Sequence, residues 1–98
     1  MAAYFIVFRD KMNDAAAYAA YGRKAGPTVA DSPGRVLAAN GALTPLEGES
    51  PDGVIIIEFP DVQAAKAWYE GPAYQAIVGE RLAATEGRAV IVEGVPAG

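Results

Sequence analysis

The chain has 98 residues, and none of them is cysteine or histidine. Without cysteine there can be no disulfide, thiolate nucleophile or zinc–sulfur site. Without histidine there can be no Ser-His-Asp triad and no imidazole ligand for a metal. Any chemistry must therefore come from carboxylates, phenols, an indole, amides and guanidinium groups.

Positive charge is also scarce, with eight Lys and Arg against twelve Asp and Glu and a net charge of −4. The basic residues are scattered, whereas phosphate binding needs them clustered, so we expect no nucleic-acid partner and no membrane partner. No apolar run approaches the ~20 residues of a membrane-spanning helix. The N-terminus has no basic stretch before its apolar run, unlike a signal peptide, so we expect a cytoplasmic protein.

Signatures of bound cofactors are missing as well. The acidic residues do not show the spacing of a calcium loop, and no G-x-G-x-x-G follows a strand. Haem is disfavoured without histidine or cysteine, although a tyrosine ligand remains open. The sequence therefore predicts no metal and no cofactor.

The segments that are present predict a single α+β domain over residues 1–98. Runs of β-branched and aromatic residues predict strands at 3–9, 35–40, 53–59 and 88–93. Helical segments are expected after a cap at Asn13 or Asp14, after a cap at Asp61, and over 73–86 with Gly87 at the C′ position. This order is βαββαβ, the ferredoxin-like arrangement of a four-stranded antiparallel sheet with its helices on one face.

The strands are apolar on both faces, which predicts a homodimer. Tyr4, Ile6 and Phe8 point to one side of the first strand, whereas Phe5 and Val7 point to the other. Helices can cover only one face, and a second copy related by a two-fold axis would cover the other. The alternative is that the long connection over 42–53 folds across the open face.

A resemblance to a known family rests on motifs that span most of the chain. The motifs are Tyr18 with Tyr21, Gly34-Arg35, Leu46-Glu47-Gly48, Ile57-Glu58-Phe59-Pro60-Asp61, Ala64-Ala65-Lys66-Ala67-Trp68-Tyr69, Pro72-Ala73-Tyr74-Gln75, Arg81 and Val90-Ile91-Val92-Glu93-Gly94. Together they resemble the domain-of-unknown-function 1330 family, although Asn40-Gly41 stands where paired glycines are expected. The resemblance implies the dimeric α/β-barrel superfamily, and it brings no activity. Relatives in the wider superfamily include cofactor-free monooxygenases, isomerases, haem-binding enzymes and ligand-binding modules.

Glu58 and Arg81 are the residues that we predict to be catalytic. Arg81 shares a predicted helical stripe with Ile77, Val78 and Leu82, where a guanidinium group must reach water or a carboxylate. It could anchor an anionic substrate or an enolate. Glu58 ends an aliphatic strand and could act as a general base, or it could form a structural ion pair with Arg81.

Four aromatic residues and one amide are the predicted substrate-binding residues: Trp68, Tyr69, Tyr74, Tyr18 and Asn40. The aromatic side chains could form a flat apolar wall for a ligand, with a tyrosine hydroxyl group as donor, although core packing is the common role of such residues. Asn40 could donate to a ligand carbonyl group, or it could serve a turn beside Gly41.

These residues favour a cofactor-free enzyme that acts on a small organic molecule, and the family resemblance implies that it could be monooxygenase- or isomerase-like. In that hypothesis Arg81 stabilises developing negative charge, while Glu58 or a tyrosine moves a proton. The alternatives are a non-catalytic dimeric module that binds small molecules or acts under stress, and a purely structural domain without a pocket.

Overall fold

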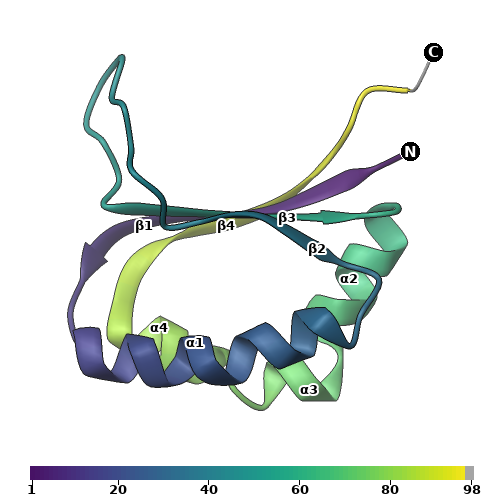
Figure 1. The fold of residues 1–98 in the computed structure, drawn as a ribbon, viewed down its shortest axis with the longest axis horizontal. Helices are drawn as coiled ribbons and strands as arrows, with labels where there is room; N and C mark the ends of the chain where they lie inside the picture. The colour runs from purple at the N-terminus through teal and green to yellow at the C-terminus, as the bar shows by residue number, and fades with distance from the viewer. Residues whose placement is uncertain (97–98) are drawn as a thin grey trace.

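The computed structural model describes residues 1–96. Its elements are β1 (Ala3–Met12), α1 (Ala15–Ala30), β2 (Arg35–Ala39), β3 (Gly53–Phe59), α2 (Val62–Glu70), α3 (Pro72–Gln75), α4 (Val78–Ala84) and β4 (Thr85–Glu93). The strands form one antiparallel sheet in the order β2-β3-β1-β4, and all the helices cover the same face (Figure 1). The ferredoxin-like α+β fold expected from the sequence is confirmed. No helix in the described part of the chain is long and apolar enough to cross a membrane.

The expected aspartate caps begin the two longest helices. The Asp14 carboxylate accepts a hydrogen bond from the Ala17 amide at 3.0 Å, and the Asp61 carboxylate accepts one from the Ala64 amide at 2.8 Å. Each bond satisfies a backbone donor that has no partner within its helix. The first helix continues through Pro27 to Ala30.

The predicted helix over 73–86 is wrong at its centre and at its end. Two short helices, α3 and α4, replace it, and β4 already begins at Thr85. Gly87 is therefore not a helix cap, because it lies within β4 opposite Arg9, where an added Cβ would collide with the Phe8 carbonyl oxygen. Pairing between β4 and the end of β1 overrides the helix propensity of these residues. Leu82 is 61% exposed and does not share the buried face of Arg81.

The core lies between the sheet and the helices and is densest under α2 and α3. Trp68 stands at its centre, with ring-centroid distances of 4.3 Å to Tyr74, 5.1 Å to Phe5 and 5.5 Å to Phe59. The Trp68 indole nitrogen donates to the Thr28 hydroxyl at 3.1 Å, which ties α2 to α1. Buried aromatic pairs of this kind add to the stabilisation from area burial.

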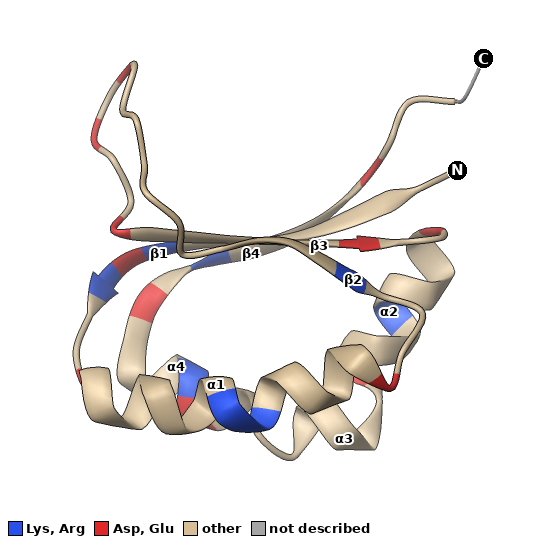
Figure 2. Ribbon diagram, viewed as in Figure 1, with Lys and Arg blue, Asp and Glu red and all other residues tan. Residues whose placement is uncertain are grey.

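The opposite face of the sheet carries apolar side chains that no helix covers. Val90 and Val92 on β4 are 48% and 47% exposed, and they lie on the same face as Ile6. Charged residues gather toward the ends of the strands and leave the middle of the sheet uncharged within residues 1–96 (Figure 2). The connection between β2 and β3 stands away from this face, and its residue Leu46 is 88% exposed (Figure 1). It therefore does not fold across the open face of the sheet, which was the alternative to a dimer.

Candidate functional site

A cleft of about 190 Å³ lies between α1 and the strands β2 and β3, and we call it the α1 cleft. The first helix contributes Tyr18, Tyr21, Gly22 and Gly26 to its wall, and Trp68 lines it from α2. Among the described residues, none of those that line this cleft is charged. Concave apolar sites with a few polar groups are typical of small-molecule binding.

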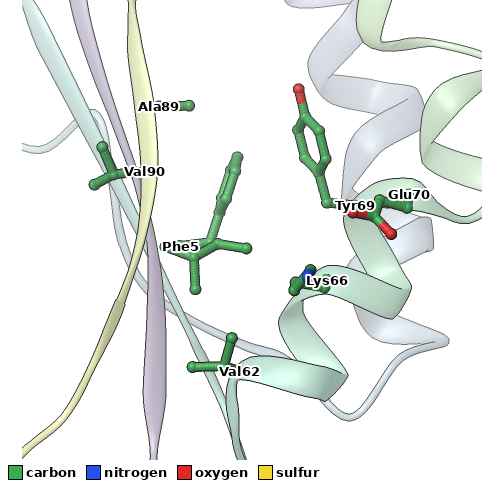
Figure 3. Close-up of a pocket in the computed structure, with 8 residues that line it drawn as sticks. Phe5, Val62, Lys66, Tyr69, Glu70, Ala89 and Val90 are labelled. Atoms are coloured by element: carbon green, nitrogen blue, oxygen red, sulfur yellow. The ribbon is translucent and has the colours of Figure 1, made fainter.

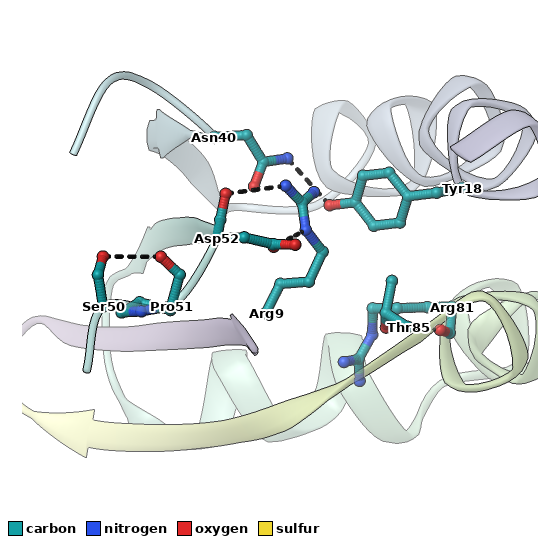
Figure 4. A network of polar contacts seen from close by, with 8 residues as sticks. All are labelled: Arg9, Tyr18, Asn40, Ser50, Pro51, Asp52, Arg81 and Thr85. Atoms are coloured by element: carbon teal, nitrogen blue, oxygen red, sulfur yellow. Dashed lines mark hydrogen bonds and ion pairs between the residues drawn. The ribbon is translucent and has the colours of Figure 1, made fainter. Parts of the chain in front are cut away.

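The polar end of the cleft is formed by Asn40 and Tyr18. The Asn40 side-chain amide donates to the Tyr18 hydroxyl at 3.0 Å (Figure 4). Asn40 has a φ of 57°, in the left-handed region that asparagine tolerates better than most residues. This backbone conformation explains why asparagine can stand where the family resemblance led us to expect glycine.

Arg9 holds the connection between β2 and β3 beside this polar pair (Figure 4). Its guanidinium group forms an ion pair with Asp52 and lies 4.9 Å from the centre of the Tyr18 ring. Burial alone would lower the pKa of Arg9, but the hydrogen bond and the charge of Asp52 outweigh burial and raise it. Arg9 therefore remains charged and fixes the loop end next to Tyr18. This role was not predictable from the sequence, because Arg9 and its partner Asp52 are far apart along the chain.

A buried chain of hydrogen bonds leads from Arg81 to the wall of the cleft. The Arg81 Nε donates to the Tyr74 hydroxyl at 3.2 Å, and the Tyr74 and Tyr21 hydroxyls are 2.6 Å apart. Arg81 is 5% exposed, and Tyr74 is fully buried. Within residues 1–96 no carboxylate lies at ion-pair distance from the Arg81 guanidinium group. The chain thus joins a buried cation to Tyr21, which lines the α1 cleft.

The environment of Tyr21 keeps its phenol protonated. Burial raises the pKa of Tyr21 strongly, and the hydrogen bond with Tyr74 raises it further, although the charge of Arg81 lowers it in part. A protonated phenol can donate a hydrogen bond to an oxygen atom that becomes negative during a reaction. Tyr21 is the one member of the Arg81–Tyr74–Tyr21 hydrogen-bond chain that was not predicted from the sequence as a site residue.

Glu58 lies away from Arg81. Its carboxylate accepts a hydrogen bond from the Arg35 guanidinium group at 2.9 Å, across the β2–β3 ladder. It is also opposite Tyr4, on the face of the sheet that the helices leave open. The two residues predicted to be catalytic are therefore not brought together by the fold.

Tyr69 lines a second, more open pocket of about 410 Å³, between α2 and β4. Figure 3 shows its ring standing in the space between the helix and the sheet, with Phe5 and Ala89 on the strand side. Lys66 and Glu70 give this pocket a charged rim. Of the predicted substrate-binding residues, the structure thus places Tyr18, Asn40 and Trp68 at the α1 cleft, Tyr74 behind it, and Tyr69 elsewhere.

Metal ligands do not gather anywhere in the described residues, where no group of three or more Asp or Glu side chains could hold an ion. The α1 cleft offers phenol, indole and amide groups instead. These groups can orient a neutral ligand and stabilise charge through hydrogen bonds.

Comparison with known proteins identifies the family. The model of the domain of unknown function DUF1330 matches residues 2–95. The chain belongs to this family. A search of curated proteins finds no match. The family assignment agrees with the resemblance seen in the sequence motifs.

Solved structures share the fold. One is the methylated RPA0582 protein, with 28% identity, a TM-score of 0.77, and coverage of 99% of this chain and 83% of that one. The RPA0582 protein of unknown function from Rhodopseudomonas palustris has 26% identity and a TM-score of 0.72 over 98% of this chain and 84% of that one. SnoaB, a cofactor-independent oxygenase from Streptomyces nogalater, has 13% identity and a TM-score of 0.70 over 98% and 95% of the two chains. At that identity the likeness to SnoaB shows a common fold and no common activity.

Proposed function

We propose that this protein is a homodimeric, cofactor-free enzyme that acts on a small organic molecule bound in the α1 cleft. The observation that supports the proposal is the buried Arg81–Tyr74–Tyr21 chain, because its last member lines the cleft beside Trp68. The likeness of fold to a cofactor-independent oxygenase is compatible with it. A cytoplasmic location remains a prediction from the sequence.

The proposed chemistry is stabilisation of an enolate or phenolate formed from the substrate. Tyr21 would donate a hydrogen bond to the substrate oxygen, and Arg81 would polarise that bond through Tyr74. An isomerase would return the removed proton to another carbon and needs no further reactant. A monooxygenase would convert a CH₂ group and O₂ into a carbonyl group and water, with the electrons supplied by the substrate.

The proton acceptor in this proposal is a tyrosine rather than Glu58. Glu58 is paired with Arg35 on the open face of the sheet, whereas the cleft opens on the helical side. Tyr18 is at the polar end of the cleft, with its hydroxyl 3.0 Å from the Asn40 amide nitrogen. Tyr18 would relay the proton of a bound ligand, accepting it at the hydroxyl oxygen while it passes its own proton to water.

The test is a screen for carbon-acid chemistry. Small cyclic ketones and phenols are incubated with the protein, first in deuterated water with NMR detection and then in an oxygen electrode. Arg81→Met and Tyr74→Phe should reduce the exchange or oxygen uptake at least about tenfold, as loss of a transition-state hydrogen bond does. The matched control is Arg23→Met, which removes an exposed arginine of α1. Full activity in Arg81→Met would refute the assignment.

The proposed dimer is formed by the open faces of two sheets. Val90, Val92 and Ile6 would be covered by the second copy, which this apolar surface requires. The connection between β2 and β3 rises on the same side of the sheet as the described segments before β1 and after β4, and it would flank the partner (Figure 1).

Analytical ultracentrifugation tests the dimer directly. The wild-type protein should sediment with twice the chain mass of 10.2 kDa. Ile56→Glu places a charge at the middle of the open face and should give monomers. Ala83→Glu on the exposed side of α4 is the control and should remain dimeric. A monomeric wild type would contradict the proposal.

A non-catalytic binding module is the second candidate, and one observation favours it. No carboxylate lines the α1 cleft, so the commonest general base other than histidine is missing there. Tight binding of a ligand recovered with the protein, without exchange or oxygen uptake in the screen, would support this candidate.

A further inference from the structure

Gly22 and Gly26 occupy positions in the interior of α1 where glycine is unfavourable. Each costs a helix about 1 kcal/mol relative to alanine, because glycine loses more backbone freedom on folding. They are four residues apart, so they lie on one face of the helix, and both line the α1 cleft. Their destabilising effect on the helix therefore calls for another explanation.

Packing does not explain these two glycines. A Cβ added at either one would meet no atom within 4 Å. At Gly34, by contrast, an added Cβ would come within 2.7 Å of the Phe59 ring, so close packing requires glycine there. Gly22 also has helical backbone geometry that any amino acid adopts. Gly26 precedes Pro27, which disfavours this geometry for a residue with a Cβ, so Gly22 is the clearer case. What Gly22 and Gly26 provide is empty space along the wall of the cleft.

The size and chemistry of the cleft define what fits in this space. An engineered cavity of about 150 Å³ in another protein holds benzene, so about 190 Å³ accommodates a single ring with a small substituent. Among residues 1–96, none of those that line the cleft is charged, and the nearby Arg9 is already paired with Asp52. An ionic ligand would therefore be buried without a partner. Trp68 and Tyr21 supply flat walls, which suit a planar ring.

The polar end of the cleft can recognise one oxygen substituent. The Asn40 amide nitrogen donates to the Tyr18 hydroxyl, which leaves the Tyr18 hydroxyl proton as a donor, while the Asn40 carbonyl oxygen lies against Gly53. The oxygen atom of a ligand hydroxyl or carbonyl group could accept a hydrogen bond from Tyr18.

We propose that the α1 cleft binds a neutral, single-ring molecule with one hydroxyl or carbonyl group, and that Gly22 and Gly26 determine this size limit. The inference rests on the proposed function only in its use of the same cleft. It is tested by ligand binding alone, whereas the proposed function is tested by the turnover of Arg81→Met. Either test can therefore fail while the other succeeds.

The experiment uses the fluorescence of Trp68, the chain's single tryptophan, which lies in the cleft wall. The purified full-length protein is titrated with cyclohexanone and with phenol, and calorimetry measures the same affinities. Both probes should change the fluorescence saturably. Benzoate, which adds a charge, and 2-naphthol, which adds a ring, should each bind at least about tenfold more weakly than phenol.

The deciding variants are Gly22→Leu and its matched control Gly79→Leu. Gly79 lies on α4 away from the cleft, and a Cβ there also meets nothing within 4 Å. Leucine favours the helix at both positions, so both variants should fold, as circular dichroism will verify. Gly22→Leu should weaken phenol binding at least about tenfold, whereas Gly79→Leu should leave it unchanged. Equal binding by the two variants, equal binding of benzoate and phenol, or no binding of either neutral probe would each overturn the proposal.

Discussion

The helices cover the sheet in two different ways. Under α2 and α3 the space is filled by rings, with Trp68 and Tyr74 4.3 Å apart and Phe59 against them. Between α1 and β2 the wall includes Gly22 and Gly26, and about 190 Å³ remains open. One half of the layer therefore supplies stability, and the other half gives up helix stability and leaves a space, which we propose holds a ligand. This contrast predicts that equal changes in the two halves will have unequal effects.

The largest expected difference in the free energy of unfolding is between Phe59→Ala and Val36→Ala. Phe59 is 1% exposed in the filled half, and its truncation should lower the free energy of unfolding by about 3–5 kcal/mol. Val36 is 47% exposed at the edge of the cleft, so its truncation should cost less than about 1 kcal/mol. Urea unfolding of both variants measures the difference. Similar losses would show that the two halves are packed alike.

A smaller difference in the free energy of unfolding is expected between Tyr74→Phe and Tyr18→Phe. The first leaves the Arg81 Nε and the Tyr21 hydroxyl without their buried partner, which should cost about 1–3 kcal/mol. The second removes a hydroxyl at the exposed end of the cleft, where water can replace it, and should cost less than about 1 kcal/mol. If Tyr18→Phe proves the more damaging in urea unfolding, the buried chain does not stabilise the fold.

The pH dependence of stability should report on Tyr21. Its pKa is raised in the folded state by burial and by Tyr74, so the folded protein holds this proton more tightly than the unfolded chain. The resulting stabilisation is complete below the unfolded pKa of about 10 and is lost as the pH rises above it. Tyr21→Phe should therefore lose less stability than the wild type between about pH 9 and pH 11. Parallel losses in the two proteins would contradict the assigned pKa shift.

The smallest expected effect is a gain of stability in the open half. Gly22→Ala should raise the free energy of unfolding by about 0.5–1 kcal/mol, because alanine favours the helix and its Cβ meets no atom. Gly34→Ala is the opposite case, since its Cβ would press on the Phe59 ring and should destabilise the protein. Thermal unfolding distinguishes a rise from a fall. A loss of stability in Gly22→Ala would mean that the glycine has a packing role.

Local signals in the sequence were sufficient for the fold. The caps at Asp14 and Asp61 and the strand over 53–59 are where they were predicted. The early start of β4 at Thr85 was missed, because it depends on pairing with Met12, a contact that helix propensity does not contain. Long-range pairing of this kind is decided by the sheet as a whole.

Less of the candidate site than of the fold could be predicted from the sequence. The alternation along β3 was the signal that could have separated Glu58 from Arg81, because Ile57 and Phe59 face the helices and Glu58 must then face away. The pairing of Tyr21 with Tyr74 had no such signal, since 53 residues separate them. Tyr18, Asn40 and Trp68 were selected from the sequence and do line one cleft, while their role in binding stays a prediction.

A crystal structure of the protein grown with phenol tests the central claim most directly. The account predicts one phenol ring in the α1 cleft, against Trp68 and beside Gly22 and Gly26, with its hydroxyl group at the Asn40–Tyr18 pair. An α1 cleft that is closed by its own side chains, or that holds only ordered water while phenol saturates the crystal, would contradict the account.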